Sequence, residues 1–115
     1  MDGKIIDSQT LAWTPHPNPK HVGVTMKTLV NAQTNNLATF HRVRIAVGGE
    51  IVPHVHETSA ETFMLTQGRA LGTMGATTQE FSAGTLGYAP AGILHGLKNI
   101  GDEQVELVAV FTPPT

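Results

Sequence analysis

Two of the six histidines stand one residue apart in the segment PHVHETSAE, residues 53–61, which also contains two glutamates. On a β-strand, side chains two residues apart project from the same face, about 7 Å apart along the backbone, so both imidazoles could reach one metal ion. Glu61 opens the next expected strand across the short turn TSA, and such a hairpin can bring its carboxylate over the same ion. His95 follows a tight turn in APAGILHGLKN and starts another expected strand, on which His95 and Leu97 share a side. The candidate ligands of one octahedral metal ion with two open positions are therefore His54, His56, Glu61 and His95.

The lack of cysteine restricts what such a site can be. Disulfides, thiolate zinc sites and cysteine nucleophiles are excluded, so a metal site must consist of histidine, carboxylate and water. Imidazole and carboxylate ligands suit Fe, Mn, Ni, Cu, Co and Zn, so we expect one divalent transition metal whose identity stays open. An open site would polarise a chelated pair of substrate oxygens or bring dioxygen next to a substrate. Both uses favour a small anionic or hydroxy-keto ligand.

Composition and charge limit the other functions of this chain. Its 115 residues are 40% apolar and 14% charged with a net charge of −2, which indicates one folded domain. The seven Lys and Arg residues are scattered singly, so there is no basic stripe for a nucleic acid and no polybasic patch for a membrane surface. No segment approaches the roughly 18 apolar residues of a membrane span, and MDGKIIDSQT lacks the apolar stretch of a signal peptide. We expect a cytoplasmic protein without nucleic-acid or membrane partners.

Short strands, rather than helices, are expected to position these residues. Segments rich in β-branched and aromatic residues are bounded by turn residues such as NAQTNN, GGE and QGR. The expected strands are residues 23–30, 37–46, 61–67, 70–75, 85–90 and 105–113, and their regular spacing favours an all-β sandwich or barrel. Prolines at positions 15, 17 and 19 exclude a central strand there. Residues 1–22 are therefore expected to form an extended arm, with Trp13 over an apolar patch, outside a single barrel domain of residues 23–115.

Two spaced motifs resemble those of a known family. Residues 48–68 read G-x5-H-x-H-x4-E-x6-G, and residues 84–99 read G-x5-P-x-G-x2-H-x3-N, with 15 residues between them. They resemble the two motifs of the cupin superfamily at every marked position. The resemblance implies an all-β fold, the double-stranded β-helix or jelly-roll barrel, with His54, His56, Glu61 and His95 as metal ligands. It also implies that the glycines and Pro90 form turns and that Asn99 is structural.

The direction of the side chains between residues 37 and 46 decides what lines the pocket beside the metal, and strand alternation leaves two possibilities. In one register His41 points into the barrel near the metal. In the other, Arg42 and Arg44 point inward and could hold an acidic substrate. Further candidates for the pocket wall are Phe63, Leu65, Tyr88, Leu97 and Phe111. His16 and His21, in the proline-rich arm, are expected to be exposed.

The leading functional hypothesis is a metal-dependent cupin enzyme that acts on a small oxygenated molecule, a hydroxy or keto compound or a carboxylate. It would work as a dioxygenase or as an isomerase or lyase, with no catalytic residues beyond the metal ligands. Fold alone does not decide function, so the alternative is a non-catalytic cupin that binds or senses a metabolite with the metal as anchor. Small barrels leave sheet edges exposed, and the strand at residues 23–30 is expected to pair with a second subunit in a homodimer.

Overall fold

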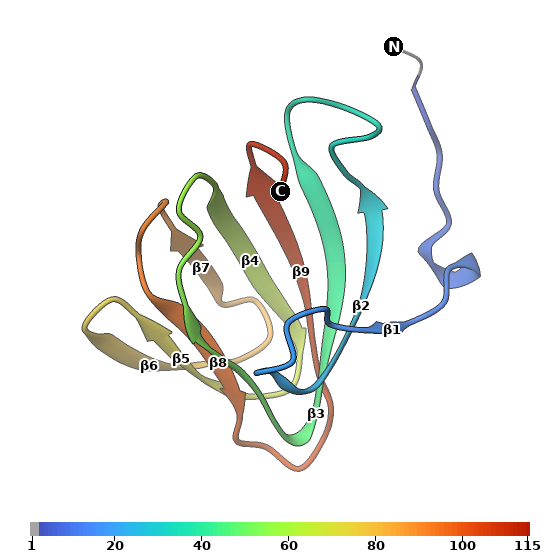
Figure 1. Ribbon diagram of the computed structural model, residues 1–115. Helices are drawn as coiled ribbons and strands as arrows, with labels where there is room; N and C mark the ends of the chain where they lie inside the picture. The colour runs from blue at the N-terminus through green and yellow to red at the C-terminus, as the bar shows by residue number, and fades with distance from the viewer. Residues whose placement is uncertain (1–2) are drawn as a thin grey trace.

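The computed structural model describes residues 3–115 and consists almost entirely of β-structure (Figure 1). Its elements are the 3-10 helix η1 (Ser8–Thr10) and the strands β1 (Thr14–Pro15), β2 (Val22–Val30), β3 (Thr39–His54), β4 (Ala60–Gln67), β5 (Ala70–Met74), β6 (Thr77–Phe81), β7 (Leu86–Ala89), β8 (His95–Asn99) and β9 (Val105–Thr112). The described residues contain no α-helix, which confirms the all-β prediction. Within this part of the chain, no helix is long and apolar enough to cross a membrane.

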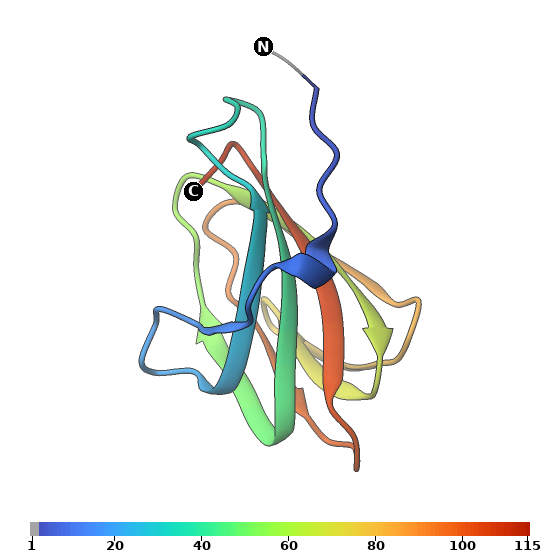
Figure 2. The ribbon, with the colours of Figure 1, turned by 90° about the vertical axis from the view of Figure 1, so that its right-hand side faces the viewer.

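The sheet is built from antiparallel pairs. Its strands lie in the order β6-β5-β8-β3-β9-β4-β7, with β2 beside β3 and β1 beside β2. This order brings strands far apart in the sequence next to one another, such as β3 and β9, and the sheet curls into a near-closed barrel (Figures 1 and 2). The arrangement is the jelly-roll barrel that the two motifs predicted.

Strand β3 belongs to both walls of the barrel. Its first part, Thr39–Ile45, pairs with β9, and its last part, Glu50–His54, pairs with β8. The strand bends at Gly48, whose φ of 76° is a left-handed conformation that glycine adopts without strain. At Gly49 a Cβ would lie 2.6 Å from the carbonyl oxygen of Val22. The segment GGE was expected to end a strand at residue 46, but it is a bend inside a longer strand, because pairing continues on a different neighbour.

The core follows the period of two that strands impose on side chains. On β9, every second residue from Val105 to Phe111 is buried. The buried core cluster consists of Val24, Met26, Val43, Ile45, Phe63, Leu65, Ala70, Phe81, Leu97, Val105, Leu107, Ala109 and Phe111. Asn99, at the end of β8, donates hydrogen bonds from its amide to the carbonyl oxygens of Ile45 and Ala46. These bonds hold β8 against the bend of β3 and so support the position of His95 at the other end of β8.

Strand β6 was not expected from the sequence. Four of its five residues, in the segment TTQEF, are exposed, so it lacks the apolar alternation by which a half-buried strand is recognised. It forms because it pairs along its whole length with β5. Its single buried residue, Phe81, packs over Gly72, where a Cβ would lie 2.4 Å from the aromatic ring. Backbone pairing with β5 and the burial of Phe81 therefore hold β6 in the sheet without alternating apolar side chains.

The segment before β2 contacts the outside of the barrel, where β1 pairs with β2. The first two residues of the expected arm, residues 1–22, lie outside the described part of the chain, and the division into arm and domain stays a prediction. Trp13 was expected over an apolar patch, but it lies against three cations. Its ring centroid is 4.6 Å from Nζ of Lys27, and 5.2 Å and 4.0 Å from the guanidinium carbons of Arg42 and Arg44. Glu106 lies 3.5 Å and 2.9 Å from these two arginines on the outer face and holds their flat groups against the indole.

Candidate metal centre

The four candidate ligands come from three strands and one loop. His54 is the last residue of β3, and His95 is the first residue of β8, directly opposite His54 in the antiparallel register. Glu61 is the second residue of β4. His56 lies beyond the end of β3, so it reaches the group through the loop and not through the shared strand face that the spacing suggested. The structure nevertheless brings all four side chains together.

Two hydrogen bonds hold the loop that carries His56. The carbonyl oxygen of His56 accepts from the backbone N–H of Gly92, at 2.8 Å. Gly92 has a φ of 83°, and it forms the turn before β8 that the sequence predicted. At the other end of the loop, the buried hydroxyl of Ser59 donates to the carbonyl oxygen of Pro113, at 2.8 Å. The loop is thus tied to the turn before β8 and to the segment after β9.

The donor atoms of the four side chains form one compact group. One ligand atom from each residue lies within 4.8 Å of all the others. Nε2 of His54 lies 3.1 Å from Nε2 of His56, and Oε1 of Glu61 lies 3.3 Å from Nε2 of His56 and 2.9 Å from Nε2 of His95. The side chains of His95 and Glu61 are 4% and 12% exposed, whereas that of His56 is 27% exposed. The group is therefore buried on the His95 side and open on the His56 side.

Backbone carbonyls fix the tautomers of two rings. Nδ1 of His54 lies 2.8 Å from the carbonyl oxygen of Val52, and Nδ1 of His95 lies 2.9 Å from that of Ile93. A carbonyl oxygen can only accept, so both Nδ1 atoms carry the proton and both neutral rings present a lone pair at Nε2. Nε2 of His95 lies 2.9 Å from a carboxylate oxygen of Glu61, so either a proton on Nε2, which makes the ring an imidazolium, or a metal ion must lie between them. Three imidazoles and a carboxylate, with two rings oriented by carbonyls, fit a divalent transition metal.

The charges in the group shift the pKa values of its members. Burial raises the pKa of Glu61, but the hydrogen bonds from His56 and His95 outweigh burial and lower it to about 2. Burial lowers the pKa of His95, but the hydrogen bond to Glu61 outweighs it and raises the pKa above its ordinary value. Burial lowers the pKa of His54. The carboxylate is therefore ionised at neutral pH, and at least one imidazole holds a proton more tightly beside it when no metal ion competes.

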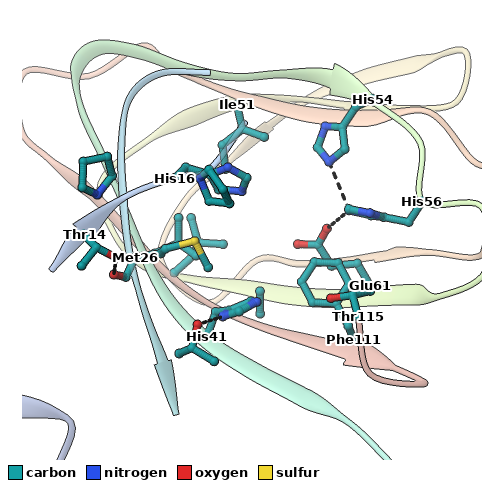
Figure 3. Close-up of a pocket in the computed structure, with 16 residues that line it drawn as sticks. Thr14, His16, Met26, His41, Ile51, His54, His56, Glu61, Phe111 and Thr115 are labelled. Carbon is teal, nitrogen blue, oxygen red and sulfur yellow. Dashed lines mark hydrogen bonds and ion pairs between the residues drawn. The ribbon is translucent and has the colours of Figure 1, made fainter. Parts of the chain in front are cut away.

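The group opens into a pocket of about 530 Å³ (Figure 3). His54, His56 and Glu61 form part of its wall, and Figure 3 draws His16, His41 and Met26 on the opposite side. The remaining lining residues are mostly apolar or hydroxyl-bearing: Thr14, Pro15, Pro17, Thr28, Val43, Ile51, Leu107, Ala109, Phe111 and Thr115. This volume lies in the range of small-molecule sites. The arrangement can hold a small ligand with one end at the His/Glu group.

The structure of β3 shows which of its two faces points into the barrel, a question that the sequence left open. His41 lies on the pocket wall with Val43, and its Nδ1 is 3.0 Å from the hydroxyl of Thr28. Arg42 and Arg44 lie on the outer face against Trp13 and do not line this pocket. The register follows from burial of Val43 and Ile45, which alternate with the two arginines.

The other candidates for the pocket wall divide between pocket, core and surface. Phe111 lines the pocket, and its ring packs edge-on against His56 with centroids 4.7 Å apart. Phe63, Leu65 and Leu97 are buried in the core instead, and the ring of Phe63 stacks on His95 with centroids 6.3 Å apart. Tyr88 is 56% exposed and lines a separate hollow on the outside. Of these five residues, only Phe111 meets the pocket.

Two histidines that the sequence placed in solvent lie close to the group. His16 and His21 were expected to be exposed, but both are half-buried, and His16 lines the pocket. The ring of His21 lies between those of His16 and His54, with centroid distances of 4.6 Å and 5.1 Å. Nδ1 of His21 accepts a hydrogen bond from the backbone N–H of Val52, at 3.1 Å. No local pattern in a proline-rich segment signals this placement, which depends on the pairing of β1 with β2.

Comparison with known proteins supports the same fold and motifs. Residues 41–111 match the family model described as Cupin domain. An uncharacterised protein of Streptomyces coelicolor is 34% identical over 62 residues, which span 54% of this chain and 55% of that relative. The match therefore covers about half the length of each protein.

Solved structures share the fold at low sequence identity. KdgF from Halomonas sp. has a TM-score of 0.85 at 18% identity, over 99% of this chain and 96% of its own. A predicted oxalate decarboxylase of Thermotoga maritima has a TM-score of 0.86 at 22% identity, over 96% and 99%. The polyketide cyclase RemF of Streptomyces resistomycificus has a TM-score of 0.85 at 16% identity, over 96% and 80%. The family model covers well over half of the sequence and includes both motifs, and we conclude that the chain belongs to the cupin family.

Proposed function

We propose that this protein is a metal-dependent cupin enzyme that acts on a small oxygenated molecule, through one divalent transition metal held by His54, His56, Glu61 and His95. The observation that carries this proposal is the compact donor group at the wall of the pocket. Nε2 of His95 and a carboxylate oxygen of Glu61 lie 2.9 Å apart in a buried position, where a metal ion can take the place of the proton that joins them in metal-free protein.

The surrounding residues support a ligand bound beside an open metal position. A bound divalent metal would polarise a pair of chelated ligand oxygens. Phe111 and Ile51 would exclude water beside the ligand. We infer a reaction of the dioxygenase or the isomerase or lyase type.

Solved structures of the same fold include proteins that are named for reactions. The fold is shared by KdgF, the polyketide cyclase RemF and an oxalate oxidase. The last of these names states a small oxygenated substrate, oxalate. The low identities limit the inference to fold, so substrate and reaction type belong to the proposal.

Elemental analysis tests the metal site directly. Protein purified without an affinity tag would be analysed by plasma mass spectrometry beside a His54→Ala, His95→Ala double variant. His41→Ala is a matched control, because it removes a histidine from the same pocket but outside the donor group. We expect about one equivalent of Fe, Mn, Ni, Cu, Co or Zn in the wild type and in the control, and none in the double variant. No metal in the wild type after reconstitution would overturn the proposal.

The same variants separate an enzyme from a binding module. Candidate hydroxy-keto compounds and carboxylates would be incubated with metal-loaded protein under air and under nitrogen, and consumption would be followed by mass spectrometry. Turnover that the double variant lacks supports the enzyme. Stoichiometric ligand binding without turnover of any compound would favour a metabolite-binding protein anchored by the metal.

We also propose that the protein forms a homodimer. Beyond residues 14 and 15, the outer edge of β2 has no strand neighbour among the described residues. Next to this edge, Leu29, Val30 and Phe40 border an apolar hollow with Ile6, and Ile5 and Leu37 are 103% and 74% exposed. An unpaired edge with apolar neighbours is a ready site for a second copy. Light scattering should give twice the monomer mass, and a monomer at micromolar concentration would refute the dimer.

A further inference from the structure

The pocket has two polar ends with different chemistry, separated by an apolar middle. The donor group of His54, His56 and Glu61 forms one end, and His16 and His41 lie on the opposite side (Figure 3). Phe111 lies between them, with its ring centroid 5.6 Å from that of His41 and 4.7 Å from that of His56. Val43, Ile51 and Leu107 add further apolar side chains to the wall. His16 lies in the segment after β1, and His41 lies on β3. A ligand that fills the pocket must therefore satisfy polar groups at both ends and apolar groups in between.

The hydrogen bonds of His16 and His41 define what this second end offers. Nδ1 of His16 accepts from the backbone N–H of Asn18, at 3.0 Å. A backbone N–H can only donate, so Nδ1 is unprotonated and the neutral ring carries its proton on Nε2. Nδ1 of His41 is paired with the hydroxyl of Thr28, which leaves its Nε2 as the remaining polar atom. Burial lowers the pKa of both rings, so both are neutral at pH 7.

Fixed positive charge is missing from this pocket. Among the described residues that line it there is no Lys or Arg, and Glu61 has the only acidic side chain. Arg42 and Arg44 lie outside, held by Glu106 and Trp13. A second negative charge on the ligand, away from the metal, would lose its hydration without gaining a cationic partner. The cost of this desolvation selects against dianionic ligands that extend across the pocket.

We propose that His16 and His41 form the far half of the ligand site and hold an oxygen atom of a chelating ligand that has an apolar body and no second charge. This inference rests on the proposed function, because it takes the near end of the ligand to be bound at the metal. It narrows the substrate class to compounds such as aryl or alkyl hydroxy-ketones and simple monocarboxylates. It also assigns a binding role to the segment after β1, through His16.

Five matched hydroxamates test the far half separately from the metal. Benzohydroxamic acid chelates a metal through two oxygens, and derivatives with a 3- or 4-acetyl or a 3- or 4-carboxylate group differ only at the far end. Binding to Zn²⁺-loaded protein would be measured by calorimetry at about pH 7. We expect the better acetyl derivative to bind about threefold to tenfold tighter than the parent, as one neutral hydrogen bond allows. Both carboxylates should bind more weakly than the parent.

Substitutions identify the residues responsible for the tighter binding of the acetyl derivative. His16→Phe should abolish the gain from the acetyl group, and His16→Gln, which keeps an N–H near the position of Nε2, should restore part of it. His41→Phe should weaken the acetyl derivative without changing the parent. Tyr88→Phe, on the outside of the barrel, should change none of these affinities. Circular dichroism would verify that each variant is folded.

Three results would overturn the inference, and a fourth concerns the proposed function alone. If the carboxylate derivatives bound as tightly as the acetyl derivatives, the statement that the far end of the pocket has no cationic side chain would be wrong. An acetyl gain that survives both His16→Phe and His41→Phe would contradict the role of these histidines. Zinc content, measured for every variant, keeps the two proposals apart. A protein that takes up no zinc would refute the metal centre, whereas one equivalent of zinc without the expected ligand preference would refute only the far half.

Discussion

Replacing Glu61 by glutamine tests the electrostatics of the donor group. Glutamine keeps the volume of the side chain and removes the only negative charge of the group. In metal-free protein, burial raises the pKa of Glu61, and the hydrogen bonds from His56 and His95 outweigh burial and lower it from 4.5 to about 2. A carboxyl group whose pKa is lower in the folded state stabilises the fold above its unfolded pKa. That contribution is lost as the pH falls through the folded value.

The size of the effect follows from the two pKa values. Their difference of about 2.5 pH units corresponds to about 3 kcal/mol. The Glu61 side chain is only 12% exposed, so solvent screens little of this energy. The pKa of His95 is raised, so its contribution is present below its ordinary value of 6.5 and is lost as the pH rises through the folded value. The pair therefore stabilises metal-free protein most between pH 4.5 and 6.5.

Urea denaturation of chelator-treated protein, followed by circular dichroism, measures this contribution. At about pH 5.5 we expect Glu61→Gln to lower the free energy of unfolding by about 2–3 kcal/mol. At about pH 8.5 the loss should be smaller, because His95 gives up its proton as the pH rises and the glutamine amide can donate to its neutral Nε2. As a control, Glu80→Gln removes a carboxylate that pairs with Arg69 on the surface, and it should cost less than about 1 kcal/mol at both pH values. A Glu61→Gln penalty of equal size at both pH values would refute the charge-pairing argument.

Three further predictions concern metal affinity, packing and the outer face. Metal affinity should fall as the pH drops from about 8 to about 5.5, because histidine binds a metal only after losing its proton, whereas Glu61, with a pKa of about 2, stays ionised throughout. Competition with a chelating dye measures this change, and a pH-independent affinity would argue against histidine ligands. Gly87→Ala should lower the free energy of unfolding in urea by about 1–3 kcal/mol, since its Cβ would lie 2.4 Å from the ring of Phe63. Gly3→Ala, with nothing within 4 Å, should leave stability unchanged, and equal losses would contradict the packing argument. Trp13→Leu should cost about 1 kcal/mol, because the two arginine guanidinium groups lose their aromatic partner. An unaltered thermal midpoint would show that these contacts add no stability.

Local spacing in the sequence was sufficient to identify the donor group. His54, Glu61 and His95 lie at or near strand ends and His56 lies in a short loop, so the spacing of the motifs and the turn-forming glycines mark them, although the shared strand face expected for His54 and His56 was wrong. Gly92 adopts the left-handed conformation that its turn needs, and Asn99 has the structural role that the second motif implied. The strands around them were recognised because they bury alternate apolar residues. Strand β6 does not bury alternate apolar residues, and it was not predicted.

Tertiary structure decided what surrounds the donor group. The inward direction of His41, and the outward direction of Arg42 and Arg44, depend on the pairing of β3 with β2 and β9, whose partners lie far away in the sequence. His16 reaches the pocket only because β1 pairs with β2, a contact that no residue pattern in a proline-rich segment reveals. The sequence alone therefore determined the family, the barrel and the four candidate ligands, since the motif spacing and the alternation of apolar residues that indicate them are properties of the chain itself. The charge and shape of the pocket come from long-range strand register, because a shift of one residue would exchange a histidine for an arginine at its wall.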